Sequence, residues 1–365
     1  MPRAAVHLMG GTRSSRSRRR YRRARRLRSD RRGVVAVIGT LLSLLVFFAL
    51  FGIFLTQYLP LWMADNEAAL VNGAASSFLS FKSGVDAQYS LGGPPTLGTP
   101  FTISSNGVPL LAQPTLASIS FIPQTCPSPT NYTASFYAKG VTGAKASNYG
   151  QPVNPGFCVF ENQTLSVGPG GSSQYTQRIA SGVLQMVIPN RYYTAETFYY
   201  EDDGVIQSQS AGYQVMAFAP PFNVTRMGGN TTVTSSFLDL TGNSTSWIGQ
   251  GSVEVYSHLL FSQEVTSNGV YVPASSSYTP FTYMFEIGTQ YPCAWSAFLE
   301  AQLAGLPTSL YNTYLPGTTT ASLPYTLSCV NPTGATTVLA VTFTSVNYAT
   351  LFYAGAEVTL AVGGT

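Results

Sequence analysis

The longest pattern in the chain is an uncharged apolar segment near the N-terminus. Residues 33–59 read GVVAVIGTLLSLLVFFALFGIFLTQYL and contain no charged side chain. A membrane-spanning helix needs about 20 apolar residues, and at about 1.5 Å per residue this segment reaches roughly 40 Å. A buried core helix, the alternative, seldom runs so far without a charge. The pattern therefore predicts a transmembrane helix over residues 33–59.

Helical periodicity continues after this segment. Five apolar residues recur at spacings of three and four and would share one helical face: Leu70, Ala74, Phe78, Phe81 and Val85. Proline removes a backbone hydrogen bond inside a helix, so Pro60 is expected to kink or interrupt it. Residues 60–89 are predicted to form an amphipathic stalk helix. Its apolar face needs a partner, either the chain's own β domain, which is the commoner case, or neighbouring subunits.

Beyond Tyr89 the apolar period changes to two, which is typical of β-strands. Alternation predicts strands near residues 233–237, 253–257, 338–344 and 358–362. Three dipeptides predict hairpin turns: Asn106-Gly107, Asp203-Gly204 and Asn268-Gly269. One helix is expected at 294–306, with an apolar side that includes Trp295 and Leu299, ended by Gly305 and Pro307.

These elements predict an α+β, membrane-anchored architecture. A long transmembrane helix and its stalk are followed by a mostly antiparallel, sandwich-like β domain over residues 90–365, with one inserted helix. A division of this domain into two modules, with a boundary near 208–230, is an alternative.

The distribution of charge predicts the orientation in the membrane. Residues 1–33 hold 13 of the 19 basic residues and one acid, Asp30, whereas residues 34–365 hold six basic and 14 acidic residues, a net charge of −8. Basic residues stay on the cytoplasmic side of a membrane. Residues 1–32 are therefore predicted to be a cytoplasmic leader, and residues 90–365 an extracellular domain of a single-pass protein of the cell membrane.

The arginine tract also raises the question of nucleic-acid binding. Runs such as RRRYRRARRLR neutralise phosphates. This tract, however, has no folded module around it and lies directly against the apolar segment, so a topology signal in contact with anionic lipid is the favoured interpretation. We expect a lipid membrane as partner and no nucleic acid.

The junction Asp30-Arg31-Arg32-Gly33-Val34-Val35-Ala36-Val37-Ile38-Gly39 resembles the class III leader of archaeal type IV pilins and archaellins. The resemblance implies that a prepilin peptidase cuts between Arg32 and Gly33, or one residue later, and that the retained helix packs in a filament core. It also implies other pilin subunits and an assembly ATPase as partners. An uncleaved signal anchor is the alternative.

Two later segments, Pro189–Tyr193 with Phe198–Ile206, and the Tyr291–Leu299 helix with its closing strand, also resemble secreted archaeal pilin-like proteins. This part of the resemblance implies architecture and no chemistry.

The four cysteines, Cys126, Cys158, Cys293 and Cys329, all lie on the predicted outer side. An even number in an oxidising compartment predicts disulfides. Three pairings are open, and Cys126–Cys158 with Cys293–Cys329 is favoured because shorter loops close more readily. A zinc site is the rival interpretation, but no Cys-x-x-Cys occurs in the chain and the outer part has one histidine.

Five Asn-x-Ser/Thr acceptors for N-glycosylation lie on the same side: Asn131, Asn162, Asn223, Asn230 and Asn243. Such triplets arise often by chance in chains rich in serine and threonine. Glycans there would imply exposed positions and would help to solubilise a domain with few charges.

Signals for catalysis are weak. A Ser-His-Asp site would have to use His258, which lacks a nucleophile motif. The acidic run Glu201-Asp202-Asp203 is more typical of a polar turn than of a calcium site, and Gly168–Ser172 lacks the Lys-Ser/Thr of a phosphate loop. Nothing in the spacing of the acids argues for paired catalytic carboxylates. We expect no enzyme, no cofactor and no metal site.

The sequence thus predicts a non-enzymatic, pilin-like cell-surface subunit, with a minor component of an archaeal type IV filament as its most specific form. The alternative is an uncleaved, membrane-anchored surface glycoprotein or adhesin that binds an extracellular ligand.

Overall fold

The protein is described from a computed structural model. The described residues are 35–90, 96–108, 111–123, 152–153, 159–167, 173–210, 212–268, 270–272, 277–279, 281–313 and 336–362. Met1–Trp62 and Met63–Thr365 form two separate compact units, and each is described by itself. Met63–Thr365 is called the body below.

The described part of the N-terminal unit is helical. An α-helix runs from residue 35 to 53, a π-helical turn follows at η1 (Phe54–Tyr58), and α2 (Leu59–Ser90) begins directly after it. In the π turn the N–H of Leu59 donates to the carbonyl of Phe54. Pro60 has no N–H to donate to the carbonyl four residues earlier, and a π turn absorbs such a break without ending the helix. The predicted disturbance of the helix at Pro60 is therefore a π-helical turn just before the proline, and the helix continues after it.

The prediction of one long apolar N-terminal helix is confirmed. The helical segment Val35–Ser90 is long and apolar enough, by length and composition, to cross a membrane. Its large apolar side chains between residues 35 and 53 are exposed, among them Val35, Leu45 and Leu50. Exposed apolar side chains in such a run mark a surface that favours a non-aqueous environment.

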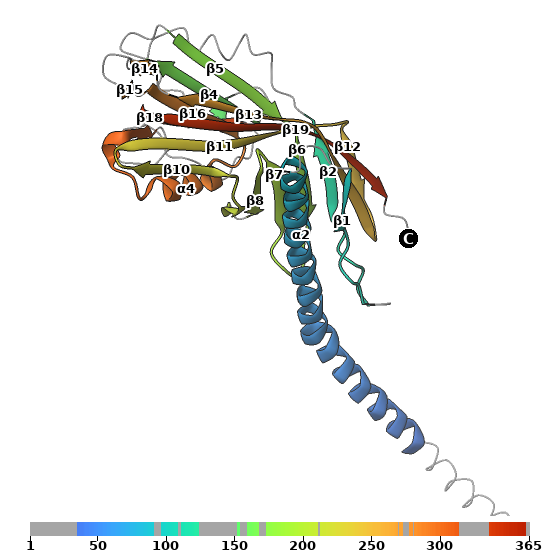
Figure 1. The fold of residues 1–365 in the computed structure, drawn as a ribbon. Helices are drawn as coiled ribbons and strands as arrows, with labels where there is room; N and C mark the ends of the chain where they lie inside the picture. The colour runs from blue at the N-terminus through green and yellow to red at the C-terminus, as the bar shows by residue number, and fades with distance from the viewer. Residues whose placement is uncertain are drawn as a thin grey trace, which may run out of the picture. The chain divides into compact units, whose positions relative to one another are not determined.

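The body is mostly β-structure, with three larger sheets (Figure 1). The first sheet has the strand order β1 (Leu97–Thr102), β13 (Ser252–Asn268), β19 (Tyr348–Val362), β11 (Asn230–Thr241) and β10 (Phe222–Met227). The second has the order β12 (Thr245–Ile248), β2 (Ser118–Ile122), β6 (Val183–Ile188), β7 (Glu196–Glu201), β8 (Gly204–Gln209) and β9 (Gln214–Phe218).

The third sheet has the order β17 (Tyr311–Thr313), β18 (Thr336–Val346), β16 (Phe281–Thr289), β4 (Val159–Val167) and β5 (Ser173–Ser181), with β3 (Pro152–Val153) paired to β18. A small ribbon joins β14 (Val270–Val272) and β15 (Ser277–Thr279). The described strand pairs are antiparallel except β11 with β19, which is parallel. The predicted mostly antiparallel β body is confirmed.

The first hydrophobic core forms where α2 meets the first two sheets. The five residues of the predicted apolar face are all buried: Leu70, Ala74, Phe78, Phe81 and Val85. The ring of Phe78 lies 5.1 Å from Phe101 on β1 and 5.7 Å from Phe198 on β7, and Phe81 lies 5.2 Å from Tyr200 on β7. The commoner alternative for the stalk is therefore confirmed from Met63 onward, because its apolar face packs on the chain's own β body.

The second core surrounds α4 (Pro292–Leu303), which packs against β9, β10 and β18. Trp295 and Leu299 of this helix are buried, as the apolar pattern predicted. A short 3₁₀ turn, η2 (Thr308–Leu310), follows it. Strand β7 separates the cores, since Phe198 faces the first and Tyr199 the second. Both cores draw residues from before and after the segment 208–230.

The four strands expected from alternation are confirmed as β11, β13, β18 and β19. The Asn106-Gly107 hairpin prediction is wrong. This dipeptide lies in a loop between β1 and β2 that is closed by single bridges, Ser104 with Leu116 and Val108 with Ala112. For Asn268-Gly269, the glycine lies outside the described residues.

The substitution Phe78→Ala tests the contribution of the helix to the first core. We expect it to lower the free energy of unfolding of the body by about 3–5 kcal/mol, because it leaves a cavity between two sheets. Chemical denaturation of the full chain in detergent micelles measures this. Leu79→Ala is the matched control. Leu79 is 43 % exposed, so this substitution should lower the free energy of unfolding by less than about 1 kcal/mol. Equal losses in the two variants would contradict the described packing.

Candidate functional site

The acidic run at residues 201–203 forms a buried hairpin turn between β7 and β8. The two strands pair up to Glu201 and Gly204, which leaves Asp202 and Asp203 as the loop. Their φ angles are 47° and 57°, as a type I′ turn requires, and aspartate tolerates this left-handed region better than most residues. The turn predicted at Asp203-Gly204 is thus displaced by one residue, because Gly204 is the first residue of β8.

Asp203 ties this hairpin to α2. Lys82 Nζ lies 2.8 Å from Asp203 Oδ1 and 3.3 Å from Asp86 Oδ2, one turn further along the helix. The hydroxyl of Tyr200 donates to Asp203 Oδ1 at 2.8 Å, and the hydroxyl of Ser236 on β11 donates to Oδ2 at 3.2 Å. The Lys82 and Asp203 side chains are 10 % and 7 % exposed. The ion pair is therefore largely shielded from water and from salt.

Two carboxylates share the single ammonium of Lys82. Burial and the negative charge of Asp203 raise the pKa of Asp86 to about 6, although Lys82 acts in the opposite direction. Asp86 remains half-exposed. The cluster thus carries more negative than positive charge when both acids are ionised.

Glu67 forms a second polar link between α2 and the sheets. Its fully buried carboxylate accepts the backbone N–H groups of Arg191 at 3.1 Å, Tyr192 at 2.7 Å and Tyr193 at 2.8 Å, together with the hydroxyl of Thr115. Burial alone would raise the pKa of Glu67, but these hydrogen bonds outweigh it and hold the pKa below its usual value. The loop after β6 is therefore organised by a helix carboxylate.

Glu201 points from the same hairpin toward the second core. Trp295 Nε1 on α4 donates to Glu201 Oε1 at 2.8 Å, and the Thr289 hydroxyl donates to the same oxygen. Oε2 is buried without a hydrogen-bond partner among the described residues. Burial raises the pKa of Glu201 to about 7, while the two hydrogen bonds lower it in part. The hairpin thus makes polar contacts with both α2 and α4.

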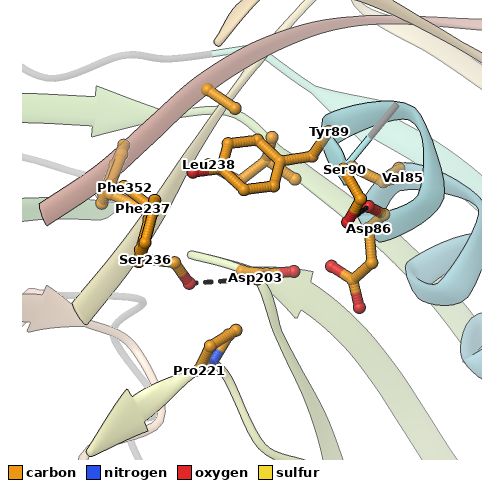
Figure 2. A pocket seen from close by; sticks show the side chains of 11 residues that line it. Val85, Asp86, Tyr89, Ser90, Asp203, Pro221, Ser236, Phe237, Leu238 and Phe352 are labelled. Carbon is orange, nitrogen blue, oxygen red and sulfur yellow. Dashed lines mark hydrogen bonds between the residues drawn. The ribbon is translucent and has the colours of Figure 1, made fainter. Parts of the chain in front are cut away.

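A pocket of about 260 Å³ opens beside the Lys82 cluster. Its walls come from α2, the β7–β8 turn, the segment before β10, β11 and β19, and they include Asp86, Tyr89, Asp203, Ser236, Phe237 and Phe352. Figure 2 shows Phe237 and Phe352 across the space from Asp86, with the Ser236–Asp203 hydrogen bond below them. Burial, followed by the negative charges of Glu264 and Asp203, raises the pKa of Tyr89 to about 12. The pocket therefore combines aromatic walls with a negative potential.

Most residues of the leader and disulfide predictions lie outside the described part of the chain: Arg32, Gly33, Cys126, Cys158 and Cys329. Cys293, at the start of α4, is disulfide-bonded. The pairing of the four cysteines and the cut between Arg32 and Gly33 stay predictions.

Three of the five glycosylation acceptors are exposed in the described structure: Asn223, Asn230 and Asn243. Asn162 lies on β4, and Asn131 falls outside the described residues. Exposure is a condition for glycosylation and leaves the modification itself a prediction.

The structure describes His258 and the acidic run, two of the other weak signals. His258 is exposed on β13, with Nδ1 3.4 Å from the hydroxyl of Thr96. Among the described residues, no group of three or more histidine, cysteine, aspartate or glutamate side chains is placed to hold a metal ion. Asp202 and Asp203 form the hairpin turn after Glu201, and Gly168–Ser172 lies outside the described residues.

The sequence pattern did not identify Glu67 and Lys82, the two charged residues that link α2 to the body. The signal was present, because Glu67 lies three residues before Leu70 and Lys82 directly follows Phe81 on the predicted apolar face. A charge on an apolar helical face predicts a buried partner. The partners in the β-hairpin and in the loop after β6, however, are 121 to 126 residues away in sequence, and Thr115 is 48 residues away.

Comparisons with protein-family models, curated proteins and solved structures find no match.

Replacing Lys82 by methionine tests the ion pair between α2 and the hairpin. The substitution keeps most of the apolar stem but leaves Asp203 buried without its cation, so we expect a loss of about 3 kcal/mol in the free energy of unfolding. Chemical denaturation of the full chain measures it. The double variant Lys82→Met/Asp203→Asn should recover part of this loss, and a double variant no more stable than Lys82→Met would contradict the coupling.

Glu201→Gln tests the pH dependence of stability. The folded pKa of Glu201, about 7, lies above the ordinary value of 4.5 for a glutamate. Its contribution to the free energy of unfolding is therefore fully present below about pH 4.5 and is lost as the pH rises through 7. Between pH 4.5 and 8 the free energy of unfolding of the native chain should fall by about 3 kcal/mol more than that of the variant. Denaturation at both pH values measures the difference. Glu357→Gln, at an exposed position, serves as control, and identical pH profiles for the native chain and Glu201→Gln would contradict the assignment.

Proposed function

We propose that this protein is a non-enzymatic, pilin-like subunit of the cell surface, held or assembled through its N-terminal helix. The single observation that carries the proposal is the helical segment Val35–Ser90. Its first part is an exposed apolar helix free of charged residues up to Tyr58. From Met63 onward the same segment supplies the apolar face buried in the body.

The contrast between the two parts of this segment supports the proposal. An exposed apolar helix is stable in a lipid bilayer or in a bundle of like helices, and costly in water. The part from Met63 onward is fixed to the β body by apolar contacts and by Lys82 and Glu67. A subunit built in this way presents a folded body and keeps one apolar helix for anchoring or assembly.

The basic leader supports the more specific form of the proposal. Removing residues 1–32 would take away the charges that set topology, and the helix that remains could pack in a filament core. The resemblance of residues 30–39 to class III leaders names the matching enzyme, a prepilin peptidase. The permanently anchored surface glycoprotein or adhesin remains the second candidate, favoured by the three exposed glycosylation acceptors of the body.

The N-terminus of the native protein separates the two candidates. We expect mass spectrometry of membrane-extracted protein to find a chain that starts at Gly33 or Val34. Gly33→Trp should block the cut and leave the arginine leader attached, because a bulky ring replaces the small residue at the cleavage site. Gly11→Trp, within the leader and far from the site, should be processed as the native chain is. An intact leader on native protein would overturn the pilin-like form and leave the anchored form.

A further inference from the structure

We propose that the pocket beside α2 binds a small organic ammonium ion, a single cationic nitrogen that carries apolar groups. The pocket belongs to the body, and the inference is independent of how the N-terminal helix is used. It rests on three properties of the site: its charge, its aromatic walls and its size.

The pocket is negatively charged because two carboxylates share the one ammonium group of Lys82. One ammonium neutralises two carboxylates, Asp203 at 2.8 Å and Asp86 at 3.3 Å. Asp203 also receives hydrogen bonds from Tyr200 and Ser236, whereas the Asp86 side chain is 45 % exposed. A second cation that enters the pocket would therefore meet Asp86 and complete the neutralisation of the pair.

The aromatic walls suit an organic cation better than an inorganic one. Tyr89 and Phe352 line the pocket as an edge-to-face pair with ring centroids 5.9 Å apart (Figure 2). Aromatic rings attract cations electrostatically and also cover the apolar groups attached to the nitrogen. Pro221 and Leu238 add further apolar surface to the lining.

The size and composition of the pocket argue against the other ligand classes. A volume of about 260 Å³ is larger than a water molecule needs and admits a small organic molecule. A hard metal cation seeks six or more oxygen ligands from several side chains, and among the described residues no group of three or more acids, histidines or cysteines is placed to hold one. An anion would be repelled by Asp86 and Asp203, and a neutral apolar molecule would leave the surplus carboxylate without a counter-ion.

Choline and its uncharged isostere 3,3-dimethylbutan-1-ol test the inference on the full chain in detergent micelles. The two probes have nearly the same shape and differ in the positive charge. We expect titration calorimetry to give a dissociation constant for choline near or below about 1 mM, and binding of the alcohol at least about tenfold weaker. Equal affinity for both probes, or no saturable binding of choline, would overturn the inference.

Asp86→Asn tests the residue that pairs with the ligand. The variant should bind choline at least about tenfold more weakly while its thermal unfolding shows an intact body. Asp65→Asn is the matched control on the same helix. Asp65 is exposed and is not part of the lining, so this variant should bind choline with the affinity of the native chain. If Asp86→Asn does not fold, Tyr89→Leu replaces it, and the loss of one aromatic wall should weaken choline severalfold. Native affinity in either folded variant would refute the proposal.

Discussion

The burial of one helical face holds this protein together. The apolar residues of α2 from Met63 onward cannot stay in water, and the first two sheets of the body converge on them. Phe78 and Phe81 are almost fully buried against rings from both sheets. Each such side chain contributes about 1.5–3 kcal/mol by leaving water. The helix is therefore a component of the core, and neither the helix nor the sheets can bury their apolar surface without the other.

Apolar contacts alone would not fix the position of the helix along the sheets, because a shift by one turn preserves much of the apolar face. The two buried charges of α2 remove this freedom. Glu67 fits three backbone N–H groups of one loop, and Lys82 fits the Asp203 carboxylate of a tight turn. A shift would leave both charges buried without partners, at a cost of several kcal/mol each. The apolar face supplies the stability and the charges supply the register.

The hairpin at Asp202 and Asp203 connects the two cores through its carboxylates. Glu201 contacts Trp295 of α4 on one side, and Asp203 contacts Lys82 of α2 on the other. Because burial raises the pKa values of Glu201 and Asp86, part of the body is more stable with these acids protonated. Beside this hairpin, Asp86 and Asp203 share the ammonium of Lys82, and this excess of negative charge is the basis of the proposed affinity of the pocket for a cation. Structural and binding properties thus arise from one set of residues.

The sequence by itself determined the elements that follow from local periodicity. The uncharged run after Gly33, the apolar face from Leu70 to Val85, the strands of alternating residues and the helix around Trp295 were all readable, because each depends on neighbours within about ten residues. Only the tertiary structure decided the rest. The turn register at Asp202 depends on the pairing of whole strands, and the partner of Lys82 lies 121 residues away. The pocket walls come from α2, a hairpin, the segment before β10, β11 and β19. Such contacts are set by how sheets and helix pack in space, which no spacing along the chain encodes.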